Sequence, residues 1–149
     1  MIVPLIKQVP PESVGGKILF VGTDGRFYNA QGRELKPQFS PYSRTRKKGY
    51  CYPMMRHFAA RLCHHLVYET FVGPRTKGLE IDHINGNKLD WRLVNLRQIT
   101  NAENVRCAKI LRAMRAVGLN PASYKQEELL NIFDKYEIND QPFNDKNYD

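Results

Sequence analysis

The first forty residues alternate short apolar runs with turn sequences. KILFVG (17–22), RFYN (26–29) and RELKPQF (33–39) are separated by TDGR and NAQG, which supply the Gly, Asn and Asp residues that tight turns favour. This pattern predicts a small antiparallel β meander. Residues 1–16, which precede it, are rich in proline and glycine, and we expect an irregular lead-in there.

A helical pattern follows the meander. Over residues 56–71, Phe58, Leu62 and Leu66 recur every four positions and so share one face. The pair Gly73-Pro74 then breaks the pattern. The spacing therefore predicts a helix over residues 56–71.

Two more helices are predicted towards the C-terminus. Thr100 and Glu103 have the spacing of a capping box, which marks the start of a helix. Gly118 and Pro121 end this helix, and its apolar face consists of Cys107, Ile110, Leu111, Met114 and Val117. The last helix is expected to start at Ser123 and to have an apolar side of Leu129, Leu130 and Phe133.

The order of the predicted elements indicates an α+β protein. A strand over LEIDHI (79–84) and a second short strand that carries Asn95 lie between the helices. We divide the chain into an N-terminal lead-in and β meander with a basic loop (1–50), a core (51–117) and a C-terminal segment (118–149). The final segment holds one helix and a tail, residues 139–149, that we expect to be disordered.

The charge of the chain points to a polyanionic partner. Its net charge is +8 and its isoelectric point is near 9.5. The last 29 of the 149 residues hold three basic and seven acidic side chains, so the remainder carries a net +12. Nucleic acid is the simplest partner for such a surface, and a soluble basic protein without a polyanionic partner is the alternative.

One basic loop concentrates part of this charge. SPYSRTRKKGY (40–50) contains no acidic residue, and its basic side chains are Arg44, Arg46, Lys47 and Lys48. We expect an exposed loop, which either contacts phosphates or is only a solvated run of charge.

The cysteine content and the N-terminus narrow the protein class. The chain has three cysteines, Cys51, Cys63 and Cys107. Their odd number and the lack of a C-x-x-C pair argue against a disulfide framework and against structural zinc. The N-terminus lacks the features of a signal peptide, and no apolar run is long enough to span a membrane. We therefore expect a reducing, cytoplasmic location.

The most informative chemistry lies in residues 79–104. Asp82 ends a predicted strand, and Asn104 lies one turn into the next helix. Carboxylate and amide oxygens are hard ligands that suit Mg²⁺ or Mn²⁺. The neighbouring His83 can take a proton from water when its imidazole is neutral. A divalent ion and a general base are what phosphodiester hydrolysis needs.

Three asparagines complete this stretch. Asn85 and Asn87 flank a glycine in a turn sequence, so they are expected to place short polar groups and backbone amides near the site. The side chain of Asn95 is expected to hydrogen-bond across the loop and so to hold His83 in place. Taken singly, each of these residues also has an ordinary structural explanation.

IDHINGNKLDWRLVNLRQITNAEN (81–104) resembles the HNH nuclease motif, in the form found in phage and intron-encoded homing endonucleases. Its Asp-His, Asn-Gly-Asn-Lys-x-Asp, Asn-Leu-Arg and Thr-x-x-x-Asn elements are all present. A weaker similarity extends the resemblance to roughly residues 17–110. It implies a ββα-metal fold in which Asp82 and Asn104 hold one Mg²⁺, for which Mn²⁺ substitutes, His83 is the general base and Asn95 is structural.

Two aromatic residues keep alternative roles. His64 matches a histidine of the family's upstream helix, where packing or a position beside a phosphate fits better than catalysis. Trp91 stands where many relatives have Asn, and it either packs over the loop or contacts a base step of DNA. By charge and position, further DNA contacts are expected from Arg75, Lys77, Lys88, Arg92 and Arg97.

The resemblance implies an endonuclease that cuts double-stranded DNA to 5′-phosphate and 3′-hydroxyl ends, encoded by a phage and acting in the bacterial cytoplasm. A non-catalytic DNA-binding protein on a nuclease scaffold and an RNA-processing nuclease remain alternatives. The acidic C-terminal segment either docks on the core or pairs two subunits, so both a monomer and a homodimer stay open.

Overall fold

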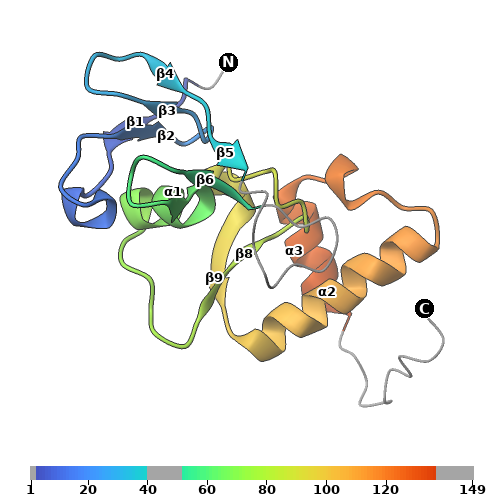
Figure 1. Cartoon of the computed structure of the whole chain (residues 1–149). Coiled ribbons are helices and arrows are strands. Elements are labelled where there is room, and N and C mark those ends of the chain that lie inside the picture. Colours follow the sequence, from blue (N-terminus) through green and yellow to red (C-terminus); the bar gives the residue numbers. More distant parts are fainter. Residues whose placement is uncertain (1–2, 40–51, 137–149) are drawn as a thin grey trace.

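The computed structural model describes residues 3–39 and 52–136. These residues form three small antiparallel sheets and three α-helices, whose arrangement can be followed in Figure 1. The strands are β1 (Ile6–Gln8), β2 (Phe20–Gly22), β3 (Phe27–Tyr28), β4 (Glu34–Leu35), β5 (Gln38–Phe39), β6 (Pro53–Met55), β7 (Arg61–Leu62), β8 (Glu80–His83) and β9 (Leu96–Ile99). The helices are α1 (Cys63–Phe71), α2 (Asn101–Ala116) and α3 (Gln126–Lys135), and the 3-10 turns are η1 (Pro11–Val14), η2 (Leu93–Asn95) and η3 (Pro121–Ser123).

The meander is present and includes a strand that the sequence did not predict. Strands β2, β3 and β4 follow one another antiparallel, but β1 also pairs with β2, with Ile6 opposite Gly22. The expectation of an irregular lead-in is therefore wrong for residues 6–8. All three β1 side chains are exposed, so no alternation of apolar and polar residues marked the strand. Val9 and Val14, both fully buried, anchor the lead-in to the core.

The first helix is shorter than predicted. It begins at Cys63, because the preceding residues form the β6–β7 hairpin, in which Met54 pairs with Leu62. Ala59 and Ala60 have left-handed backbone angles, with φ of 57° and 49°. A helix cannot continue through such angles. The four-residue spacing of apolar residues therefore reflects contacts of the hairpin with the core, rather than two further helical turns.

The last two helices agree more closely with prediction. The Thr100 hydroxyl accepts a hydrogen bond from the Glu103 amide at 3.2 Å, so Thr100 caps α2 as expected. Val117, assigned to the apolar face, follows the end of the helix and is exposed. Helix α3 begins at Gln126 instead of Ser123, because η3 occupies residues 121–123.

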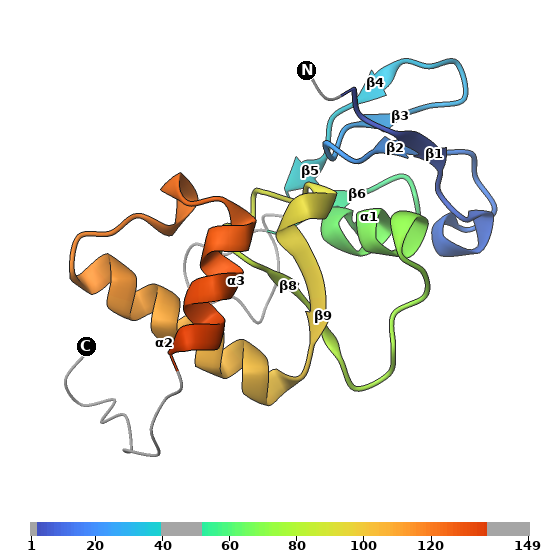
Figure 2. The ribbon, with the colours of Figure 1, turned by 180° about the vertical axis from the view of Figure 1, so that it is seen from behind.

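Two hydrophobic cores lie on either side of the β8–β9 hairpin. The first contains the meander and α1, with Phe27, Leu66 and Val67 among its buried residues. The second is built from α2, α3 and Ile84. Figures 1 and 2 show the hairpin between these two parts of the molecule. Because neighbouring side chains of a strand point to opposite faces, β8 presents consecutive residues to the two cores.

Helix α3 docks on α2. Leu129 and Phe133 are buried against α2. The Arg106 guanidinium of α2 donates to the carbonyl oxygens of Phe133 and Tyr136, at 2.8 and 3.0 Å. Of the two expectations for the C-terminal segment, docking is therefore the one that these residues adopt. The predicted tail, 139–149, and the basic loop, 40–50, lie outside the described residues.

In the described part of the chain, no helix is both long and apolar enough to cross a membrane.

Candidate active site

Strand β8 carries the two central candidates to opposite faces. Its pairing with β9 sets His83 opposite Leu96 and Asp82 opposite Arg97. The His83 ring points towards α1, where its centroid lies 4.7 Å from that of His64. Asp82 lies on the α2 side, since its partner Arg97 also contacts Cys107 of α2. The two side chains therefore flank the end of one strand.

His83 lies in a setting that keeps its imidazole neutral. The side chain is 2% exposed, and its Nε2 has no hydrogen-bond partner among the described residues. Burial, with the nearby Lys88 charge, lowers the pKa of His83 to about 4. A neutral ring with a free nitrogen lone pair can accept a proton. This base is weaker than the ordinary imidazole assumed from the sequence.

His64 is buried next to His83. It is 4% exposed, and its Nδ1 also lacks a hydrogen-bond partner among the described residues. Burial is the main cause that lowers the pKa of His64 to about 2. The neighbouring His65 ring lies 4.3 Å away, and its pKa is lowered to about 4, again mainly by burial. His64 therefore packs directly against the candidate base, a contact that the sequence alone did not indicate.

Asn95 fastens the loop that follows His83. It is fully buried at the end of η2, one residue before the strand in which it was predicted. Its Oδ1 accepts from the Asn85 amide at 3.1 Å, and its Nδ2 donates to Asn85 Oδ1 and to the Asp90 carbonyl, both at 2.9 Å. Backbone hydrogen bonds across the loop were expected of Asn95, and the structure shows them. Gln126 of α3 also reaches Asn95 Oδ1, at 3.4 Å.

Asp90 is a loop residue that sequence reasoning missed. Its carboxylate accepts from Asn85 Nδ2 at 3.0 Å and from both Nε and Nη2 of Arg92, at 2.7 and 2.8 Å. Burial acts to raise the pKa of Asp90, but the hydrogen bonds and charge of Arg92 outweigh it, so the pKa lies below its usual value. Arg92, predicted to contact DNA, is thus engaged with Asp90. Asn87 closes the turn by accepting from the Leu89 amide at 3.0 Å.

Arg97, a second predicted DNA contact, is also paired with a carboxylate. Its Nε lies 3.1 Å from Asp82 Oδ2, and its guanidinium lies over the Phe133 ring, 5.2 Å from the centroid. Burial raises the pKa of the Asp82 carboxyl, although the hydrogen bond from Arg97 opposes this shift. Arg97 therefore neutralises a candidate metal ligand inside the protein, whereas the charge pattern had suggested a phosphate contact.

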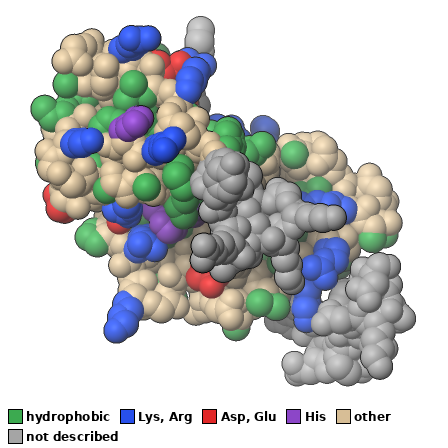
Figure 3. Space-filling model, in the orientation of Figure 1, with side chains coloured by type: hydrophobic (Ala, Val, Ile, Leu, Met, Phe, Trp, Pro, Cys, Tyr) green, Lys and Arg blue, Asp and Glu red, His purple; other side chains and the backbone are tan. Residues whose placement is uncertain are grey.

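The other predicted DNA contacts are scattered. Arg75 Nε lies 3.9 Å from Glu69, Lys77 is exposed, and the Lys88 amine lies 5.3 Å from the Tyr52 ring centroid. Figure 3 shows Lys and Arg side chains over both the meander and the α2 side of one face. The basic residues of the 40–50 loop, Arg44, Arg46, Lys47 and Lys48, lie outside the described residues.

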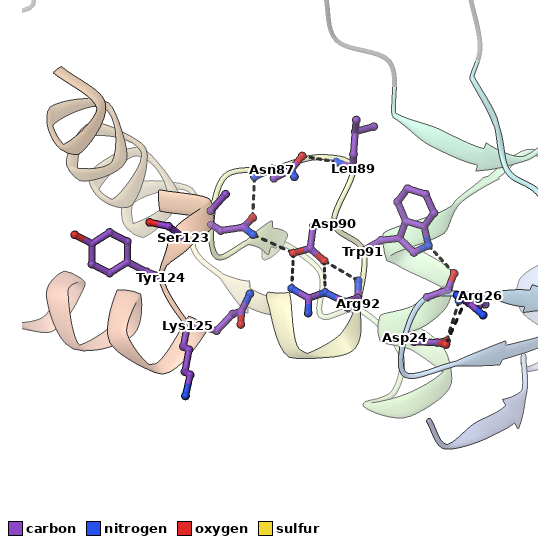
Figure 4. Close-up of a pocket in the computed structure, with 14 residues that line it drawn as sticks. Asp24, Arg26, Asn87, Leu89, Asp90, Trp91, Arg92, Ser123, Tyr124 and Lys125 are labelled. Carbon is purple, nitrogen blue, oxygen red and sulfur yellow. Dashed lines mark hydrogen bonds and ion pairs between the residues drawn. The ribbon is translucent and has the colours of Figure 1, made fainter. Parts of the chain in front are cut away.

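Trp91 packs against the meander. Its indole Nε1 donates to the Gly25 carbonyl at 2.7 Å, as Figure 4 shows. Gly25 has φ of 85°, and a Cβ there would lie 2.7 Å from Trp91 Cδ1, so only glycine fits. This contact matches the packing alternative for Trp91. Beside it, a cleft of about 620 Å³ lies between residues 24–26, the 85–92 loop and residues 122–126.

The oxygen donors near Asp82 suit a divalent ion by type. Glu80 and Asp82 are two residues apart on β8 and so share a face. Asn104 of α2 donates its Nδ2 to Glu80 Oε2 at 2.5 Å, which brings its amide to that face. Such oxygens match Mg²⁺ or Mn²⁺. Within residues 3–39 and 52–136, no three His, Cys, Asp or Glu side chains gather into a metal-binding group, so an ion would need the Asn104 oxygen.

The buried histidines predict loss of stability in acid. The pKa of His64 is about 2 in the folded chain and near 6.5 when unfolded, so the unfolded chain binds more protons below pH 6.5. The contribution of neutral His64 to the free energy of unfolding should be fully present above pH 6.5 and should decrease as the pH falls below that value. At pH 5, His64 alone should lower the free energy of unfolding by roughly 2 kcal/mol relative to its value at neutral pH. Urea unfolding at pH 7.5 and pH 5 measures this, and His64→Phe should reduce the difference. Equal pH dependence in both proteins would contradict it.

Comparison with known proteins bears on the same segment. Residues 61–106 match the model of a family described as HNH endonuclease. Among solved structures, the chain resembles one described as "DNA binding and cleavage by the HNH homing endonuclease I-HmuI", with 26% identity and a TM-score of 0.50. The match covers 72% of this chain and 60% of that chain, so this chain spans less than two thirds of its length. No curated protein matches. Through residues 61–106, the chain is therefore similar to HNH endonucleases.

Proposed function

We propose that the chain is a metal-dependent endonuclease that hydrolyses phosphodiester bonds of double-stranded DNA. The observation that carries this proposal is the arrangement around β8. A neutral His83 with an unpartnered nitrogen lies on one face, and Asp82 lies on the other, next to the oxygen donors of Glu80 and Asn104. The family match covers the same residues, and the solved relative is described as binding and cleaving DNA.

In this proposal His83 is the general base. Its free ring nitrogen takes a proton from a water molecule, which then attacks the scissile phosphorus in line with the leaving 3′ oxygen. Asn95 keeps His83 in position, because it ties the backbone on both sides of the 85–92 loop together. By analogy with the outer hydrogen-bond partners of metal ligands, loss of such a supporting group would reduce activity by about 10–100-fold.

Asp82 and Asn104 would hold the divalent ion, with β8, β9 and α2 forming the ββα unit. A bound Mg²⁺ or Mn²⁺ supplies electrostatic stabilisation of charge that develops on the phosphate and the leaving oxygen. Arg97 pairs with the Asp82 carboxylate at 3.1 Å, so a divalent ion would have to share this carboxylate with Arg97 or displace it. The products would carry 5′-phosphate and 3′-hydroxyl ends, and the gene would be of phage origin.

Asp82→Ala tests the metal requirement. We expect it to reduce the rate of duplex cleavage at saturating Mg²⁺ by on the order of 10²-fold or more, since it removes a charged ligand of the ion. Cleavage of an end-labelled duplex from the native genomic neighbourhood measures this, and ligation of the products by DNA ligase reports the end chemistry. Asp24→Ala, which removes a partly exposed carboxylate from the turn between β2 and β3, is the control. Cleavage that persists in EDTA, or in Asp82→Ala, would contradict the metal assignment.

A further inference from the structure

Glu80 forms a hydrogen bond with Asn104, one of the two proposed metal ligands. It is exposed at the start of β8, two residues before Asp82 and on the same face of the strand. Its Oε2 accepts a hydrogen bond from Asn104 Nδ2 at 2.5 Å, across 24 residues of sequence. This contact links β8 to the first turns of α2. Neither the motif nor the charge pattern had singled out Glu80.

The contact determines which way the Asn104 amide faces. An ionised carboxylate can only accept hydrogen bonds, so the NH₂ group of the amide must point towards Glu80. The oxygen of a planar amide lies on the other side from its nitrogen, and Asn104 Oδ1 is therefore directed away from Glu80. The contact with Glu80 uses the Asn104 nitrogen and leaves Oδ1 out of this hydrogen bond. Its lone pairs remain available to a cation.

Loss of the Glu80 carboxylate would remove the hydrogen bond that holds this orientation. Asn104 is only partly buried, and the terminal torsion of asparagine is broad and roughly two-fold. A freely turning amide would present its NH₂ group to the ion for part of the time, and a cation cannot bind there. Glu80 also adds a second negative charge near Asp82, which would attract a cation to this face.

We infer that Glu80 is a positioning residue of the ion site: it fixes the Asn104 amide with Oδ1 available to the divalent cation. The inference rests on the proposed function, because it takes Asp82 and Asn104 as the ligands. Glu80 does not bind the cation itself in this account. It acts through Asn104, as the outer hydrogen-bond partners of metal ligands do.

Measurements of Mn²⁺ affinity distinguish the orienting effect of Glu80 on Asn104 from the effect of its negative charge. Titration of the full chain with Mn²⁺, followed by electron paramagnetic resonance of the free ion, gives the affinity without any cleavage. Glu80→Ala should weaken Mn²⁺ binding by about 10-fold. Glu80→Gln keeps an acceptor oxygen for Asn104 Nδ2 but removes the charge, so it should stay within about 3-fold of wild type. Glu128→Ala, which removes an exposed carboxylate from α3, is the matched control and should bind like wild type.

The outcomes distinguish this inference from the proposed function. Wild-type affinity in Glu80→Ala, or equal losses in Glu80→Ala and Glu80→Gln, would overturn positioning by Glu80 while leaving the ion site intact. A wild-type chain that binds no Mn²⁺, or an Asp82→Ala variant that binds it normally, would overturn the ion site and the inference with it. As a readout that needs no metal, the side-chain NH₂ resonances of Asn104 should shift in Glu80→Ala and much less in Glu80→Gln.

Discussion

His83→Ala is expected to reduce the single-turnover rate of DNA cleavage by on the order of 10²–10⁴-fold, the usual contribution of a general base. The reason is local. His83 is buried and neutral, with a pKa of about 4, and its Nε2 has no partner among the described residues. Among the described residues, it is the imidazole that directly follows a proposed metal ligand on the same strand.

The same variant should bind duplex DNA almost as tightly as wild type. His83 carries no charge at neutral pH, so its removal leaves the electrostatic attraction to phosphates unchanged. A filter-binding or anisotropy assay in EDTA measures this affinity. His57→Ala, which removes an exposed histidine outside the site, is the matched control and should cleave normally. Unchanged cleavage by a folded His83→Ala protein would exclude His83 as the base.

Asn95→Ala is expected to lower the free energy of unfolding by about 3–5 kcal/mol. Asn95 is fully buried, and its side chain satisfies the Asn85 amide, the Asn85 side-chain oxygen and the Asp90 carbonyl. Each buried polar group left without a partner costs about 1–3 kcal/mol. The alanine side chain is also too small to fill the space, which adds to the loss.

Urea unfolding at pH 7.5 measures this change. Asn87→Ala is the control, because Asn87 is exposed and its side chain accepts one local hydrogen bond, from the Leu89 amide. It should cost less than about 1 kcal/mol. Asn95→Asp should also destabilise, since a carboxylate cannot donate to the Asp90 carbonyl or to Asn85 Oδ1. Equal free energies of unfolding for Asn95→Ala and wild type would contradict the stabilising role of the Asn95 hydrogen bonds in the 85–92 loop.

Features with local causes were predictable from the sequence. The Asp-His strand, the Thr100 cap of α2 and the turns of the meander depend on residues close together in the chain, and the structure shows them. The first helix was over-extended because its early apolar residues serve the β6–β7 hairpin. Contacts with the rest of the core, rather than local spacing, decide between these two forms.

In the candidate site, too, the features set by nearby residues were predictable, and those set by the tertiary fold were not. Asp82, His83, Asn95 and Asn104 belong to one short stretch, so the sequence could bring them together. Arg92 and Arg97 remain predicted DNA contacts. Their pairing with Asp90 and Asp82 was not predictable, because composition shows charge but not which carboxylate lies opposite. Their partners depend on strand register and on the docking of α2. Glu80 had an unused signal: its position two residues before Asp82 on a strand places both side chains on one face.

Cleavage of a supercoiled plasmid that carries the native genomic neighbourhood of the gene tests the roles of His83 and the divalent ion together. Wild type and His83→Ala would be compared with Mg²⁺, with Mn²⁺ and with EDTA. We expect conversion to open-circle or linear DNA by wild type with either metal, and none in EDTA or with His83→Ala. Conversion in EDTA, equal conversion by the variant, or no conversion by a wild-type protein that binds the DNA would contradict it.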